Sequence, residues 1–334
     1  MSGKDTISLI QSLEQIPPAQ SFLLDTFFTS TENHNSEIIE IDVVKGSRRL
    51  APFVRPVSEA RLSLREGFVS DTIKIPYIKL KRPLEVKDSM QRMPGENPYA
   101  GISPEARARA IRLKDYAEMR TQIQRREEWM AAKGLLDGEV TCKGEDIEAT
   151  ADFKMTGTHK ITLLTPWTDA ASDPIKDIRT WKRLITKDSG LTANIMIFGN
   201  DVTDAFLANE VIDKILNNRR YEAGSIDITK TTVGVSPVGS ILGLNIYEYD
   251  EWFVDPDTGL SMPLIPADTI LIGSTQARCT RHYGVIQDVQ ALIPVAYYPK
   301  SWIEQDPGRE WNMLQSAPLP IPHQIDAFMS VVTV

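Results

Sequence analysis

The stretch from Ser103 to Gly134 carries the strongest helix signal in the chain and limits the fold more than any other segment. Ser103 stands at an N-cap position, Pro104 follows at the first helical position, and Gly134 is placed to end the helix. A helix over 103–134 is a rod of about 45 Å. Its apolar residues form a thin face: Ala106, Ala110, Leu113 and Ala117, with Tyr116, Ile123 and Met130 at seven-residue spacing. Such a helix is predicted to lie on a sheet and to leave much of its surface to solvent or partner molecules.

Charge is distributed unevenly along the chain. Residues 1–44 hold one lysine against seven acidic residues, whereas residues 45–87 hold eleven lysines and arginines against four acidic residues. The whole chain of 334 residues nevertheless has a formal net charge of −8. This balance disfavours a dedicated nucleic-acid-binding protein, because such proteins concentrate positive charge against phosphates. An acidic arm followed by a basic segment therefore needs another explanation.

Residues 1–44 are predicted to be an arm rather than a self-sufficient domain. Pro17 and Pro18 break any early helix. A short apolar cluster follows, made up of Phe22, Leu23, Leu24, Phe27 and Phe28. Residues 45–88 have the pattern of an extended hairpin, because isoleucine and leucine alternate with lysine around Lys74 and Lys79. The alternation changes phase at Pro76, which favours a bulge or a sheet edge there.

The remaining sequence favours an α+β fold. Between about 166 and 295, strand-like segments alternate with capped amphipathic helices, which is typical of a compact mixed α/β domain. The tail, 296–334, returns to strands and proline-rich turns. Only two cysteines occur, no signal peptide is apparent, and no apolar run approaches the roughly 18 residues that span a membrane. A soluble protein of a reducing compartment is expected.

No motif specifies a catalytic, cofactor or metal site, so the chain is not expected to be an enzyme. The four histidines, His34, His159, His282 and His323, show no spacing that would place two of them on one face. Cys279 lies near Arg278 and His282, which could lower its pKa. Residues 278 and 279 point to opposite faces of a strand, however, so a catalytic cysteine is not favoured.

The C-terminal region is similar to that of the lambda-type phage major capsid proteins, the protein E family. The segments "GSTQARCTRHYGVIQD" and "YYPKSWIEQDPGREWNMLQSAPLPIP" carry the resemblance. The matching stretches, in order, are Gly273–Arg278, Arg281–Gly284, Ile286–Asp288, Tyr298–Trp302, Asp306–Glu310 and Gln315–Leu319. Six ordered segments are not explained by chance. Looser likenesses in "FLLDTFF", "YIKLKRPLEV", "QRMPGENP" and "GLLDGEVTCKGE" extend the resemblance over nearly the whole chain, weakest between about 219 and 260.

The resemblance implies a Hong Kong 97-type capsid fold. Its parts would be an N-terminal arm over 1–44, an extended loop over 45–88, a peripheral domain over 89–165 and 296–334 with a spine helix over 103–134, and an axial domain over 166–295. It also implies a function: self-assembly into hexamers and pentamers that form an icosahedral shell around the double-stranded DNA of a tailed phage. No cofactor and no membrane partner are expected. The expected partners are further copies of the chain, a portal protein, a scaffold or protease and, as a further candidate, a decoration protein. The expected location is the virion head, after assembly in the host cytoplasm.

We expect the basic loop to lie against an acidic surface of an adjacent subunit, where charge complementarity guides association. The predicted subunit-interface residues are Lys79, Lys81, Arg82, Arg278, Arg281, Tyr283, Lys300, Trp302 and Arg309. Arg278, Arg281 and Tyr283 are interpreted as anchors of strands or of subunit contacts rather than as chemical groups.

Other functions remain open at this stage. A nucleic-acid-binding protein could use the basic 45–87 segment and would then bind with steep salt dependence, but aromatic residues suited to base stacking are sparse there. An enzyme could have its site at Arg278–Tyr283, if a pocket held a perturbed acid or base. A phage tail-tube or scaffold protein would not explain the long helix together with an α/β insertion.

Overall fold

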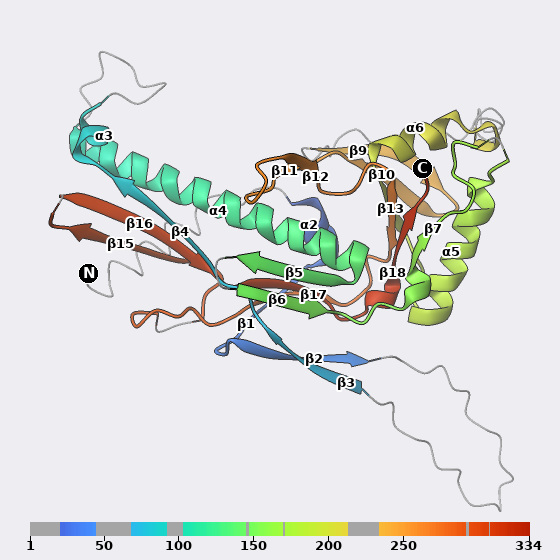
Figure 1. The fold of residues 1–334 in the computed structure, drawn as a ribbon, viewed down its shortest axis with the longest axis horizontal. Coiled ribbons are helices and arrows are strands. Elements are labelled where there is room, and N and C mark those ends of the chain that lie inside the picture. Colours follow the sequence, from blue (N-terminus) through green and yellow to red (C-terminus); the bar gives the residue numbers. More distant parts are fainter. Residues whose placement is uncertain are drawn as a thin grey trace, which may run out of the picture.

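The computed structural model describes residues 21–44, 68–91, 103–144, 147–169, 171–212, 234–291, 294–306 and 308–334. Residues 1–20 of the predicted arm and 45–67 of the predicted extended loop lie outside the described residues, as do residues 219–233 of the 219–260 stretch. The described chain forms a long helix, α4, flanked by several small sheets, with a larger mixed sheet at one end (Figure 1).

Helix α4 (Pro104–Asp137) begins where the sequence predicts. The Ser103 hydroxyl accepts a hydrogen bond from the backbone N–H of Ala106 at 3.2 Å. The predicted stop at Gly134 is wrong, because the helix continues to Asp137 and ends at Gly138, which has φ +74°. Gly134 lies inside the helix, close to the ring of Phe153, where the packed surroundings offset the modest cost of a helical glycine.

A six-stranded mixed sheet forms the end of the molecule that corresponds to the predicted axial domain. Its order is β7-β18-β13-β8-β10-β9. The strands are β7 (Lys160–Thr162), β18 (Phe328–Val332), β13 (Thr269–Gly273), β8 (Ile195–Phe198), β10 (Leu244–Tyr249) and β9 (Val235–Ile241). Helices α5 (Pro174–Ser189) and α6 (Asn200–Ala208) lie at this end (Figure 1). Their apolar residues share a core with the sheet in which Trp167 packs against Trp181, Phe198 and Phe206.

The sheets do not follow the boundaries that the sequence suggested at 166 and 295. Strands β7 and β18 come from segments assigned to the peripheral domain, yet both belong to the six-stranded sheet. Conversely, β14 (Cys279–Tyr283), from the predicted axial segment, pairs with β17 (Pro318–Pro322) and with β1 (Ser30–Asn33) of the arm. The physical reason is burial: every residue of β13 is buried, so this strand needs a partner on both sides, and β18 provides one.

The arm carries the short helix α2 (Phe22–Phe27) before β1. Its predicted apolar cluster is confirmed, because Leu23, Leu24, Phe27 and Phe28 are all buried in a core shared with the C-terminal part of α4. The Phe27 and Phe328 rings pack edge to face with centroids 5.1 Å apart. The arm is therefore anchored on its own subunit through this cluster.

The segment predicted as one extended hairpin over 45–88 divides into two parts. Strand β2 (Ile38–Val44) pairs antiparallel with β3 (Phe68–Lys74), so the hairpin begins inside the predicted arm and ends at Lys74. Strand β4 (Ile78–Leu84) instead pairs with β16 (Arg309–Ser316), which pairs with β15 (Tyr298–Glu304). Figure 1 shows β2 and β3 projecting on one side while β4 runs along α4. The break falls at Pro76, where the sequence predicted a bulge or a sheet edge within one hairpin.

The sheet β15-β16-β4 packs on the N-terminal half of α4. Tyr116, Met119 and Ile123 of the helix pack on Leu314 of β16. The Arg112 guanidinium also pairs with Glu310 at 2.8 Å. The remaining elements are α3 (Val86–Met90), β5 (Glu139–Gly144), β6 (Ile147–Asp152), β11 (Trp252–Val254), β12 (Ser261–Pro263) and two 3-10 turns at Gly157–His159 and Ile325–Ala327. Within the described ranges, no helix is long and apolar enough to cross a membrane.

Candidate functional site

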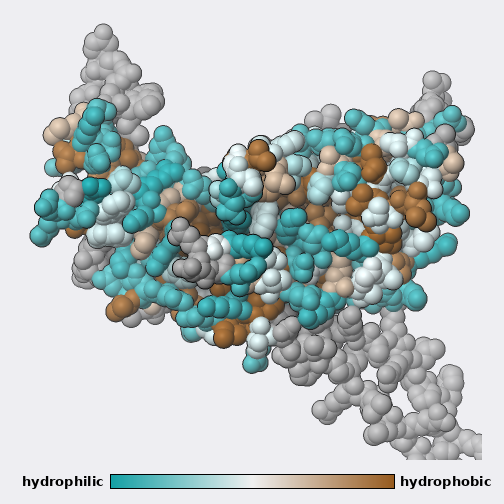
Figure 2. Space-filling model, in the orientation of Figure 1, coloured by the Kyte–Doolittle hydropathy of each residue, from teal (hydrophilic) through white to brown (hydrophobic). Residues whose placement is uncertain are grey.

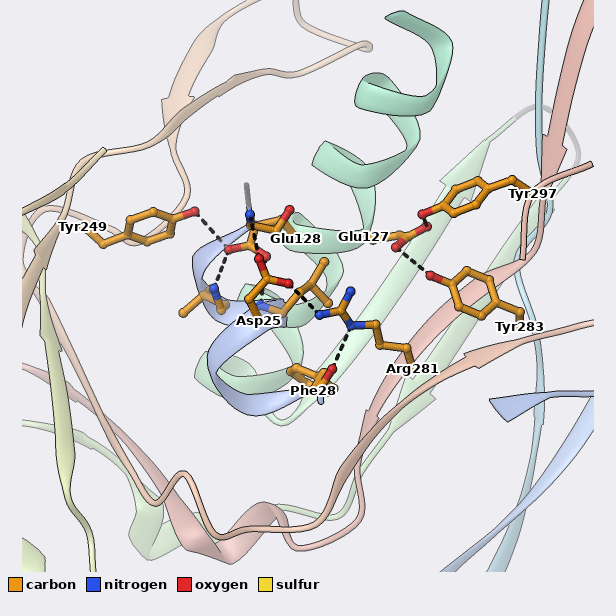
Figure 3. A network of polar contacts seen from close by, with 11 residues as sticks. Asp25, Phe28, Glu127, Glu128, Tyr249, Arg281, Tyr283 and Tyr297 are labelled. Carbon is orange, nitrogen blue, oxygen red and sulfur yellow. Dashed lines mark hydrogen bonds and ion pairs between the residues drawn. The ribbon is translucent and has the colours of Figure 1, made fainter. Parts of the chain in front are cut away.

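Two consecutive carboxylates, Glu127 and Glu128, lie buried in α4, with 2% and 3% of their surface exposed. They point to different sides of the helix and organise a network of polar contacts (Figure 3). We call this set the arm network. It comprises Asp25, Glu127, Glu128, Tyr249, Arg281, Tyr283 and Tyr297, with the backbone of Leu23, Leu24 and Phe28.

Glu128 binds the first turn of the arm helix α2. The backbone N–H of Leu23 donates to its Oε1 at 2.7 Å, and that of Leu24 donates to its Oε2 at 3.0 Å. The first N–H groups of a helix have no partner within the helix, so the carboxylate satisfies two of them. The Tyr249 hydroxyl of β10 donates to the same Oε1 at 3.0 Å. One side chain therefore links the arm, the long helix and the six-stranded sheet.

Glu127 faces the other side and accepts hydrogen bonds from two tyrosines. The Tyr297 hydroxyl donates to Oε1 at 2.9 Å, and the Tyr283 hydroxyl of β14 donates to Oε2 at 3.0 Å. Arg281 also attaches the arm. Its Nε donates to the Phe28 carbonyl at 2.8 Å, and its Nη2 forms an ion pair with Asp25 Oδ1 at 2.8 Å. Both strand β14 and the arm are thus fixed to α4, by two consecutive carboxyls that point to different sides of the helix.

Burial raises the pKa of Glu127 and that of Glu128 to about 7, because the charged carboxylate loses its hydration. The hydrogen bonds from Tyr297 and Tyr283 act against this rise at Glu127, and the N–H groups of Leu23 and Leu24 do so at Glu128. A carboxyl of raised pKa can act as a general acid when a substrate reaches it. Here, every carboxylate oxygen already accepts a bond within the subunit, so the network holds elements together.

The predicted residues Arg281 and Tyr283 of β14 belong to the arm network, whereas Arg278 is exposed just before this strand. Cys279 is buried, and burial raises the pKa of its thiol to about 12, so it stays protonated and unreactive at neutral pH. Arg281 and Tyr283 bond to the arm and to α4 within the subunit. A role of Arg278, Arg281 and Tyr283 in subunit contacts stays a prediction.

The other six predicted residues lie on the sheet β15-β16-β4, away from the arm network. Arg82 forms ion pairs with Asp115 and Glu118 of α4 in its own chain. Lys300 pairs with Asp288 at 2.7 Å. Lys79 lies over Tyr77, while Lys81 and Arg309 lie over Trp311, whose ring stacks on that of Trp302. These contacts are within one chain, and a role of the six residues in subunit contacts remains a prediction.

The expectation that no two histidines share a face is wrong. His34 Nε2 lies 2.7 Å from His282 Nδ1, and His282 Nε2 lies 3.2 Å from His323 Nε2. The three residues come from the arm, from β14 and from the end of β17, so strand pairing rather than spacing brings them together. Burial, with help from the neighbouring rings, lowers the pKa of His282 to about 3 and keeps its imidazole neutral.

Sequence reasoning missed Glu127, Glu128, Tyr249 and Tyr297. Glu127 offered a signal, since it stands four residues after Ile123 and three before Met130 and so falls on the apolar stripe of the helix. A charged residue at a core position marks a buried polar network.

Comparison with known structures identifies the class of protein. A prophage protein of Escherichia coli CFT073, whose crystal structure is described as that of a capsid protein, superposes with a TM-score of 0.77. It is 22% identical, and the match covers 98% of this chain and 99% of that one. The arm, the long helix and the mixed end sheet thus form a Hong Kong 97-type phage capsid fold.

Sequence comparison gives the family. The profile of the phage major capsid protein E family matches residues 5–333, and the chain belongs to this family. The major capsid protein of Escherichia phage lambda is 27% identical over 99% of both chains. That of Enterobacteria phage P21 is 28% identical over 98% of both. The chain is therefore a structural capsid protein of the virion that assembles with copies of itself, and a nucleic-acid-binding function through the 45–87 segment is not favoured.

Proposed function

We propose that this capsid protein assembles into hexamers and pentamers, which close into an icosahedral head shell around the double-stranded DNA genome of a tailed phage. The family membership over residues 5–333 is the observation that carries the proposal. Assembly would take place in the host cytoplasm. Its proposed partners are a portal protein, a scaffold or protease and, as a further candidate, a decoration protein. Rings with closed symmetry use the same contacts repeatedly, so one chain can supply both kinds of ring.

Exposed apolar residues on the β11–β12 hairpin support an assembly role. Val254 and Leu260 are 65% and 64% exposed, and Trp252 and Met262 are nearly half exposed. In Figure 2, hydrophobic residues interrupt the hydrophilic surface over the region where Figure 1 places this hairpin. Clustered exposed apolar residues of this kind mark protein–protein contacts. The ring of Phe253 packs on Trp129 of α4, with centroids 6.4 Å apart, so the hairpin is held in place before any partner arrives.

The predicted contact through the basic residues remains part of this proposal. Lys79 and Lys81 are exposed on β4 and lie over aromatic rings that hold their ammonium groups in position. An acidic surface of a neighbouring subunit would complement them, and such pairing mainly sets orientation and association rate.

We also propose that the chain has no catalytic activity. Among the described residues, the Glu127 and Glu128 carboxyls have a pKa raised to about 7, but both are buried and hydrogen-bonded within the subunit. A surface depression lined by Phe22, Thr26, Asn194, Ile195, Val235, Asn245, Tyr247 and Thr275 has no carboxylate, histidine or cysteine in its lining.

The β11–β12 hairpin offers a direct test. The double variant Val254→Asp with Leu260→Asp should abolish shells and rings in electron micrographs of the purified protein, with an unchanged melting temperature because both side chains are exposed. The variant Val254→Ile with Leu260→Met keeps the apolar surface and should assemble as the unmodified chain does. Normal shells from the aspartate variant would show that this hairpin is no subunit contact.

A further inference from the structure

Strand β1 of the arm is held in an unusual way. All four of its residues are exposed, so it contributes no buried side chain of its own. It pairs in parallel with β14, in a register that places Glu32 opposite His282. Just after β1, the backbone N–H of His34 donates to the Tyr283 carbonyl at 2.7 Å. Backbone pairing thus brings a carboxylate and two imidazoles to one point between the arm and the body of the subunit.

The three side chains converge closely. His34 Nε2 lies 2.7 Å from His282 Nδ1, and Glu32 Oε2 lies 3.8 Å from the same nitrogen. The ligand atoms of all three residues lie within 4.8 Å of one another. Nitrogen and oxygen ligands at about 2.0–2.1 Å from a tetrahedral zinc ion are roughly 3.3 Å apart. The distance between the two histidine nitrogens is shorter than that value, and the distance from His282 Nδ1 to Glu32 Oε2 is longer. A small rotation of the half-buried His34 ring would bring the atoms into position.

His282 is oriented to serve as a ligand. His282 is 3% exposed, and its second ring nitrogen, Nε2, lies 3.2 Å from His323 Nε2. A histidine that binds a metal usually donates its other N–H to a neighbouring acceptor, which fixes the tautomer and the ring plane. With the proton on Nε2 and donated to His323, His282 presents the lone pair of Nδ1 towards His34 and Glu32.

We propose that Glu32, His34 and His282 form a binding site for a divalent cation of the zinc class, with His323 as the residue that positions His282. Two imidazoles and one carboxylate suit such a borderline cation. Glu32 is half exposed, which leaves an entry path and room for a water molecule as a fourth ligand. The bound ion would fasten β1, which lacks buried side chains, to β14. This site goes beyond the proposed assembly function and does not depend on it.

The test uses the full-length chain, stripped of metal by dialysis against a chelator and titrated with cobalt(II) chloride. We expect one cobalt ion per chain, with the visible absorption of a tetrahedral or five-coordinate site, and displacement by zinc chloride. His34→Ala and Glu32→Gln should each weaken binding at least tenfold, and His323→Ala should weaken it while keeping one ion per chain. Glu37→Gln, an exposed glutamate on the same arm segment, is the matched control and should bind normally.

A second readout guards against variants that fail to fold. Zinc should raise the melting temperature of the unmodified chain and of Glu37→Gln, and a chelator should reverse the rise. His34→Ala, which alters a half-buried side chain, should have the same melting temperature with and without zinc. Absence of cobalt binding by the unmodified chain, or equal binding by His34→Ala, would overturn the proposal.

Discussion

Glu128 Oε1 accepts the backbone N–H of Leu23 at 2.7 Å, although the two residues are 105 positions apart in the chain. The same carboxylate accepts the N–H of Leu24 and the hydroxyl of Tyr249. A buried carboxyl with these partners explains how the described part of the arm, which begins with α2, stays attached to its own subunit. The attachment depends on the two acceptor atoms of one side chain.

Glu128→Gln is expected to lower the free energy of unfolding by about 1–3 kcal/mol, because the amide nitrogen would face a backbone N–H and leave that donor unpaired. Glu127→Gln is the matched control. Its partners are hydroxyls, which can both donate and accept, so at pH 5, where the Glu127 carboxyl of the unmodified chain is protonated, its cost should stay below about 1 kcal/mol. Urea unfolding of the unassembled chain at pH 5 measures both values. Equal effects of the two substitutions would contradict this account of the arm.

The raised pKa values of Glu127 and Glu128 predict a pH dependence. Each carboxyl holds its proton in the folded state up to a pKa of about 7, above the usual value of 4.5. Between these values the folded state binds more protons than the unfolded state, so the contribution to stability is present below pH 4.5 and is lost as pH rises through 7. The loss is on the order of 3 kcal/mol per group.

Glu127→Gln isolates this effect, since glutamine does not titrate. The stability of this variant relative to the unmodified chain should increase between pH 5 and pH 8, by an amount on the order of 3 kcal/mol. Urea unfolding at the two pH values gives the comparison. A difference between variant and unmodified chain that stays constant with pH would show that Glu127 keeps an ordinary pKa.

The end of α4 gives a third prediction. Gly138 has φ +74°, and a Cβ atom there would meet the side chain of Met155. Gly138→Ala should therefore destabilise the protein by about 1–2 kcal/mol or more, because the backbone strain adds to the clash with Met155. Gly144→Ala is the control, because its position has a normal φ and open space around it. Thermal unfolding of the two variants should differ clearly, and similar melting temperatures would argue against the left-handed cap.

A fourth prediction concerns the basic surface of β4. Lys79→Glu with Lys81→Glu should reduce the yield of assembled particles and weaken the salt dependence of assembly, if these residues meet an acidic neighbour. Arg82 is left unchanged, because a glutamate there would repel Asp115 and Glu118 of the same subunit and destabilise the fold itself. Lys176→Glu with Lys187→Glu, two exposed lysines of α5, is the control for the same change of net charge. Undiminished assembly of the double variant would exclude the predicted contact.

Local signals in the sequence predicted local structure well. Ser103 and Pro104 mark the start of α4, and Pro76 marks the break between β3 and β4. The end of α4 was misplaced at Gly134 because tertiary packing around that residue outweighs the weak helix propensity of glycine. The helix ends at Gly138 rather than at Gly134, four residues earlier, because Gly138 adopts the left-handed conformation. The sequence alone does not show which of the two glycines does so.

Partners that are distant in the chain could not be predicted in the same way. The pairing of β18 with β13 and of β1 with β14 depends on which buried edges meet in the folded chain, not on periodicity within either strand. The arm network and the histidine cluster both arise from such pairings. Glu127 on the apolar stripe was the one visible sign of the network, but its tyrosine partners lie more than 150 positions away.

The most direct test of the capsid assignment is electron microscopy of the purified full-length chain, prepared alone and after co-expression with the scaffold or protease of its phage. The account predicts closed shells, or rings with sixfold and fivefold symmetry, in at least the second preparation. Discrete monomers in both preparations, at concentrations where a related phage capsid protein assembles, would contradict it.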